Sequence, residues 1–210
     1  MVIAVSASMP ALYWLQTRLA DNGFGFAFRP SSLWDGQWWP GLLTSIFVHG
    51  NWAHVAMNAV SALAFAAPVA RLMPGARGVA GFLAFYIACG LLAAVGFALV
   101  HPDSNDALVG ASGAVFGLMG AALRLLGLRT GRLRALTDKR FLTPAAAIMA
   151  VNAAIGLIGF APGAEGARVA WEAHAFGFIA GALLIGPWSS LFKPRPEAFD
   201  SPPDLRDPET

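Results

Sequence analysis

Charged residues divide this chain into long stretches that contain no Asp, Glu, Lys or Arg. A membrane-spanning helix needs about 20 predominantly apolar residues, and six stretches are long enough to hold one. The stretches are 1–17, 36–70, 78–102, 107–123, 141–164 and 173–192. Within them the pattern predicts spans at about 1–19, 53–72, 78–100, 108–127, 142–161 and 171–191. Because six helices use most of the chain, we expect an all-α membrane protein with one domain over residues 1–192.

The composition supports a membrane protein and excludes several other classes. Hydrophobic residues make up 57% of the chain and charged residues 12%, whereas charged residues average about 25% in soluble domains. Cys89 is the only cysteine, so an internal disulfide or a CxxC zinc or redox pair is excluded. The first stretch lacks the leading Lys or Arg of a signal peptide, which predicts an anchor. A net charge of +2 gives no indication of nucleic-acid binding.

The basic residues predict how the spans are oriented. If both termini are cytoplasmic, eleven of the fourteen Lys and Arg residues lie on the inner side, as the positive-inside rule requires. Only Arg18, Arg29 and Arg168 then lie outside. Residues 193–210 are rich in proline and acidic residues, which predicts a disordered cytoplasmic tail. The preference for Arg over Lys, with abundant Ala and Gly, favours a bacterial source and thus the plasma membrane.

Four polar residues lie near the outer ends of three predicted spans. The second, fourth and sixth spans all run from outside to inside, so His54, Asn58, Ser112 and His174 are expected at one depth. An ionisable group inside a membrane indicates a functional site. Each residue also has a plainer interpretation. Either histidine can be a hydrogen-bonded packing residue, and a serine among glycines can simply allow close helix contact.

Glycine spacing brings two of these residues within reach of each other. Gly113 and Gly117 form one GxxxG pattern and Gly177 and Gly181 another, and such strips let helices approach closely. If the strips face each other, Ser112 Oγ and a His174 ring nitrogen come within about 2.6–3.2 Å. Imidazole can then take the serine proton, which defines a Ser-His dyad. The absence of acidic residues from the six stretches argues against a Ser-His-Asp triad.

The neighbouring residues offer hydrogen-bond donors for an oxyanion. Ser112 lies near a helix start, where backbone N–H groups lack intrahelical partners. His54 and Asn58 share one helix face at i and i+4 and can add side-chain donors. Phe116 lies one turn after Ser112, where it can pack on the imidazole or serve only in core or lipid packing.

These motifs together resemble those of the rhomboid intramembrane serine proteases. The GxSG motif of that family corresponds to Gly110, Ser112 and Gly113, and its HxxxN motif to His54 and Asn58. The sixth-helix histidine and its glycines correspond to His174, Gly177 and Gly181, and residues 43–54 are similar to the segment that leads into the second helix of the family. The resemblance runs from about Trp34 to Trp188.

The resemblance implies a function for each of these positions. Ser112 corresponds to the nucleophile, His174 to the general base, and His54, Asn58 and the Ser112 backbone N–H to the oxyanion hole. Phe116 corresponds to the aromatic residue on the catalytic histidine, and His49 to a supporting histidine. The family cuts single-pass membrane proteins without a metal or cofactor. Two positions depart from the family pattern: Trp39-Pro40 replaces Trp-Arg in the first loop, and Ala70 replaces an acidic residue.

Three other functions compete with this interpretation. His54 and His174 can be ligands in a haem or quinone protein, although that leaves Ser112 and Asn58 unexplained. A catalytically inactive rhomboid-like protein that binds membrane clients is a second alternative, against which the presence of both Ser112 and His174 argues. A transporter is a third, but no internal repeat is evident.

Overall fold

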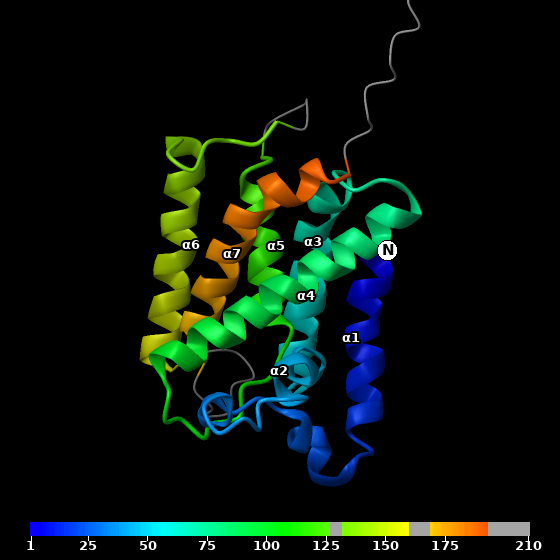
Figure 1. Cartoon of the computed structure of the whole chain (residues 1–210), viewed down its shortest axis with the longest axis vertical. Coiled ribbons are helices and arrows are strands. Elements are labelled where there is room, and N and C mark those ends of the chain that lie inside the picture. Colours follow the sequence, from blue (N-terminus) through cyan, green and yellow to red (C-terminus); the bar gives the residue numbers. More distant parts are fainter. Residues whose placement is uncertain (127–131, 160–168, 193–210) are drawn as a thin grey trace, which may run out of the picture.

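The computed structural model describes residues 1–126, 132–159 and 169–192. Within these ranges most residues are helical and no β-strand occurs, which confirms the all-α prediction for this part of the chain (Figure 1). The long helices are α1 (Val2–Gln16), α3 (Trp52–Ala70), α4 (Gly75–Val100), α5 (Ser112–Leu123), α6 (Lys139–Ile158) and α7 (Trp171–Ser190). The shorter segments η1 (Ala20–Phe26), η2 (Pro30–Leu33), α2 (Gly41–Thr44) and η3 (Ser45–Phe47) lie between α1 and α3. The predicted tail at 193–210 lies outside the described residues.

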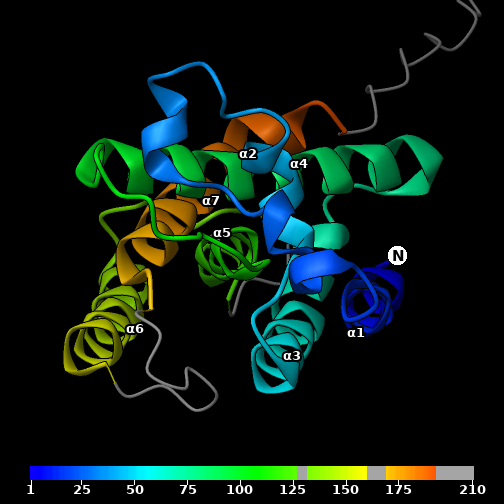
Figure 2. The same cartoon turned by 90° about the horizontal axis from the view of Figure 1, so that it is seen from below.

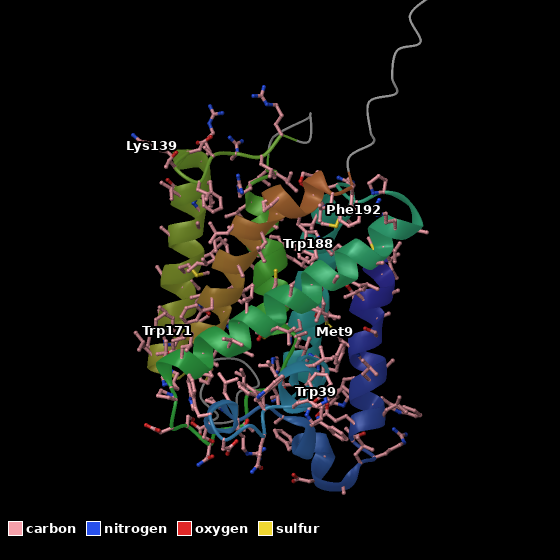
Figure 3. All side chains as sticks on the ribbon, viewed as in Figure 1. Met9, Trp39, Lys139, Trp171, Trp188 and Phe192 are labelled. Atoms are coloured by element: carbon pink, nitrogen blue, oxygen red, sulfur yellow. The ribbon has the colours of Figure 1, made fainter. Side chains whose placement is uncertain are left out.

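The surface of the helices is that of a membrane protein. By length and composition, α3, α4 and α6 can each cross a bilayer, and α1 and α5 are shorter apolar helices. Side-chain nitrogen and oxygen atoms gather at two ends of the molecule, with carbon-rich side chains between them (Figure 3). Lys139 lies at one end and Trp171 toward the other. This distribution is typical of a multi-pass membrane protein.

Helix α5 lies in the middle of the bundle. Seen from below, it is surrounded by α3, α4 and α7, and it packs against all three (Figure 2). Most of its residues are buried. Helix α6 packs mainly on α7 and leaves most of its surface exposed. The interior therefore centres on α5, with α6 at the edge.

Glycines allow α5 and α7 to pack backbone against backbone. A Cβ atom built on Gly177 would lie 2.1 Å from the carbonyl oxygen of Gly113. One built on Gly181 would lie 1.8 Å from the carbonyl oxygen of Gly117. These distances leave no room for a methyl group, so the two strips of small residues face each other in direct contact.

Helix α5 begins later than the predicted start at residue 108. Leu108 forms an isolated antiparallel bridge with Phe28, with backbone N···O distances of 2.7 and 3.1 Å. Gly110 has a φ of +116°, which ends any helical path before Ser112. The prediction at this end is wrong because a lack of charge does not distinguish extended apolar backbone from helix. The predicted end at 127 lies outside the described residues, and the helix itself ends at Leu123.

A buried amide joins the end of α1 to the loop before α3. The Gln16 side-chain Nε2 donates to the His49 carbonyl oxygen at 2.8 Å, and Gln16 Oε1 accepts from the His49 backbone N–H at 2.9 Å. Gln16 is 5% exposed. These two hydrogen bonds fix the backbone that leads into α3, which carries two of the candidate site residues.

Candidate active site

Ser112 is the first residue of α5, and its hydroxyl lies beside α7. Ser112 Oγ is 2.8 Å from His174 Nε2. The turn before it is held by a bond of 2.9 Å from the Gly110 backbone N–H to the Ser45 carbonyl oxygen. Because the first N–H groups of a helix have no intrahelical partner, the start of α5 also presents unpaired donors next to this hydroxyl.

His174 lies in the first turn of α7 between an aromatic ring and an amide. The Phe116 ring stacks on the imidazole with 4.4 Å between centroids and 5° between planes. On the other ring nitrogen, His174 Nδ1 is 2.8 Å from Asn152 Oδ1 of α6. Side chains from α5, α6 and α7 therefore meet at one imidazole.

His54 and Asn58 reach the same place from α3. The start of α3 is capped by Asn51 Oδ1, which accepts from the His54 backbone N–H at 2.9 Å. A Cβ on Gly110 would lie 2.6 Å from His54 Cε1 and Nε2 and 3.6 Å from Asn58 Nδ2. Both side chains thus pack against the glycine two residues before Ser112, and any larger residue would displace the His54 ring.

Asn58 carries a buried amide donor without a hydrogen-bond partner among the described residues. The residue is 5% exposed, and the unpaired atom is its Nδ2. A buried unsatisfied amide costs about 1–3 kcal/mol, so such a group calls for an explanation. A buried N–H donor of this kind can bind the oxygen of a ligand.

His49 lies behind His54 rather than beside Ser112. Its ring meets the His54 ring edge to face with 5.2 Å between centroids. It is 1% exposed, and neither ring nitrogen has a partner within the described part of the chain. Burial, with a smaller effect of His54, lowers the pKa of His49 to about 4, so the ring is neutral near pH 7. Its position is that of a support for His54.

Asn152 is the site residue that the sequence reasoning missed. It is 6% exposed on α6, where it follows Phe141 and Ala145 on the buried face. Its sequence position could have indicated a functional residue, because a polar side chain inside an apolar span is uncommon. Glu172, the acidic residue nearest His174 in sequence, pairs instead with His101 Nε2 at 3.2 Å.

Comparison with known proteins identifies the family of the chain. The family model "Rhomboid domain" matches residues 35–189. The chain is 29% identical over 150 residues to "Putative rhomboid protease YdcA" of Bacillus subtilis (strain 168), covering 71% of this chain and 67% of that protein. It is 35% identical over 88 residues to "Rhomboid protease GluP" of the same organism, covering 42% of this chain and 16% of that protein.

A family match over most of the chain defines its class. The protein belongs to the rhomboid family, and its apolar helices make it a multi-pass membrane protein.

Proposed function

We propose that the protein is an intramembrane serine endopeptidase with Ser112 as nucleophile and His174 as general base. The observation that carries this proposal is the 2.8 Å separation of Ser112 Oγ and His174 Nε2 across the α5–α7 contact. A serine hydroxyl becomes a useful nucleophile when a base can take its proton at this distance. The rhomboid family match and the names of its relatives support the same activity.

The reaction proceeds by acylation and hydrolysis. His174 Nε2 takes the Ser112 proton while Oγ attacks the substrate carbonyl carbon, and the carbonyl oxygen becomes an oxyanion. His174 then gives its proton to the leaving amine as the C–N bond breaks. A water molecule attacks the acyl-serine ester with His174 again as base, which releases the new carboxyl end and restores Ser112. Neither a metal nor a cofactor enters these steps.

The oxyanion hole is formed by the Ser112 backbone N–H, Asn58 Nδ2 and the His54 ring. The contact of both α3 side chains with Gly110 and the unpaired, buried amide of Asn58 support this assignment. Gly110 and Gly113 permit the close approaches, Phe116 holds the imidazole plane, and His49 supports His54. Preformed donors of this kind stabilise the transition state without reorganisation.

The substrates are single-pass membrane proteins, cut where the transmembrane helix is interrupted. Carbonyls within a helix are hydrogen-bonded and shielded, so the bond cut should lie near small or helix-breaking residues. In the proposed topology all six long helices of the 1–192 domain cross the plasma membrane of a bacterium, and both termini are cytoplasmic. The basic end marked by Lys139 in Figure 3 is then the inner side, as the positive-inside rule requires.

Asn58→Ala should slow cleavage less than loss of the nucleophile does. Removal of one oxyanion donor costs about 100-fold to 1000-fold in kcat, and other donors remain here. The effect should appear in kcat with little change in KM, because the donor acts on charge that develops in the transition state. Steady-state kinetics on a fluorogenic membrane substrate measure both constants. A change confined to KM would contradict the assignment.

Labelling with a fluorophosphonate probe tests the activity directly. The detergent-purified wild type should be labelled on the peptide that contains Ser112, and Ser112→Ala should not be labelled. Ser190→Ala, at the exposed far end of α7, serves as the matched control and should be labelled like the wild type. If the folded wild type fails to react beside an active reference protease, the inactive client-binding alternative replaces this proposal.

The haem or quinone alternative loses support from the contacts of His174. Both of its ring nitrogens lie 2.8 Å from protein partners, Ser112 Oγ and Asn152 Oδ1. An iron ligand needs one of these nitrogens free, so ligation would break a contact that the fold already makes.

A further inference from the structure

Asn152 makes two hydrogen bonds that together leave its amide only one orientation. Its Nδ2 donates to the Trp171 carbonyl oxygen at 2.8 Å, and its Oδ1 lies 2.8 Å from His174 Nδ1. A carbonyl oxygen can only accept, so the amide nitrogen must face Trp171. The amide oxygen therefore faces the imidazole.

This orientation fixes which nitrogen of His174 carries the proton. An amide oxygen only accepts, so His174 Nδ1 must be the protonated nitrogen that donates to Asn152. In a neutral imidazole the other nitrogen, Nε2, then has a free lone pair. That lone pair points at Ser112 Oγ, which is the arrangement that a general base requires.

The packing around Asn152 fixes the position of its amide along α6 relative to the start of α7. A Cβ on Gly156, one turn further along α6, would lie 2.4 Å from Trp171 Cδ1, so the Trp171 ring fits directly over that glycine. This contact sets the position of α6 against the start of α7. Phe116 stacks on the imidazole and fixes its plane, but stacking alone does not select one tautomer.

We propose that Asn152 is the positioning residue of a Ser112–His174–Asn152 arrangement. It holds the Nδ1–H tautomer of His174 and aims Nε2 at the serine. Helix α6 itself contains no acidic residue; Asp138 only caps its start. A neutral amide therefore takes the position that an aspartate has in a Ser-His-Asp triad. The inference rests on the proposed function, because positioning matters only if His174 is the base.

Kinetics of two variants distinguish a role of Asn152 in orienting His174 from a role that only joins α6 to α7. Asn152→Ala removes both hydrogen bonds, and kcat should fall about 100-fold, the cost of a displacement of roughly 1 Å at a reacting group, with KM nearly unchanged. Asn152→Asp keeps an acceptor for His174 but loses the donor to Trp171. It should retain most of kcat, whereas a residue that only clamps α6 to α7 would make Asn152→Asp at least as poor as Asn152→Ala.

The pH profile gives a second kinetic readout. In Asn152→Asp the carboxylate beside His174 stabilises the protonated imidazolium form, which cannot act as a base. As the pH is lowered, the variant therefore loses activity sooner, at a higher pH than the wild type does. The acid limb of kcat should therefore move up by about one pH unit or more in Asn152→Asp. Val151→Ala, at an exposed neighbouring position on α6, should leave both the rate and the profile unchanged.

Nitrogen-15 NMR of histidine-labelled protein tests the proposal without any activity. The chain has four histidines, so the His174 signals are assigned by their loss in His174→Ala. The wild type should show the Nδ1–H tautomer at His174, and Asn152→Ala should show loss of that preference. An Nε2–H tautomer in the wild type would overturn the inference even if the enzyme is active. An Nδ1–H tautomer in a protein that neither labels nor cleaves would keep the positioning and reject the proposed function.

Discussion

Ser112→Ala and His174→Ala should each lower the cleavage rate of a membrane substrate by about 10⁶-fold, with only the weak catalysis due to binding and the oxyanion hole remaining. In the proposed mechanism either change removes the whole nucleophilic pathway, because the hydroxyl and the imidazole, 2.8 Å apart, act as one unit. The double variant should therefore be no slower than either single variant. Such non-additivity is the mark of two groups that serve one step.

The measurement is single-turnover cleavage of a purified single-pass substrate in liposomes. Thermal unfolding in detergent should show that both variants remain folded. Ser190→Ala provides the matched serine control. Cleavage by Ser112→Ala at close to the wild-type rate would assign the nucleophile to another residue, and additive losses in the double variant would show that the two side chains act in separate steps.

Gly177→Ala should damage the active site without touching a reacting group. The new methyl would lie 2.1 Å from the Gly113 carbonyl oxygen, and a backbone atom cannot turn aside as a side chain can. Helices α5 and α7 must therefore separate at a point one residue from Ser112 and three from His174. We expect at least about a 100-fold loss of kcat, because misplacement by about 1 Å has that cost. Overpacking should also cost about 1–3 kcal/mol of stability.

Gly25→Ala is the control for this glycine substitution. A Cβ at Gly25 would meet nothing within 4 Å, so its activity and melting temperature should match those of the wild type. Cleavage rates and thermal unfolding of the two variants provide the comparison. Wild-type activity in Gly177→Ala would mean that the α5–α7 contact can relax without moving the dyad.

The positions of the helices in the sequence could largely be predicted from the distribution of charged residues. Each charge-free stretch holds all or most of one long helix, because uninterrupted apolar sequence of this length is stable in a bilayer only as helix. The same criterion failed before Ser112, where Leu108 is apolar yet pairs as extended backbone with Phe28 and Gly110 has a φ of +116°. Backbone conformation there depends on pairing with Phe28, a residue 80 positions away in the chain, and local polarity carries no information about it.

The residues of the candidate site could be predicted only in part from the sequence. Ser112, His54 and His174 are marked by glycines or by a polar partner at helical spacing, so their meeting could be inferred. Asn152 has no such partner within its own helix. Its contact with His174 depends on how α6 is rotated and how far it is shifted along α7, which the Gly156–Trp171 packing determines. Likewise, the Gln16–His49 pairing follows from the path of a loop.

Helix α5 is shorter than the hydrocarbon layer is thick, and in the proposed topology its length sets the depth of Ser112. Twelve residues rise about 18 Å, whereas the hydrocarbon layer is about 30 Å thick. Arg124, directly after α5, binds the Arg134 and Ala182 carbonyl oxygens and marks the cytoplasmic boundary in the proposed topology. Ser112 then lies about 12 Å beneath the outer boundary, a depth that about four extended residues span. If Ser112 is the nucleophile as proposed, the length of α5 therefore sets the distance between the outer membrane surface and the bond that is cut.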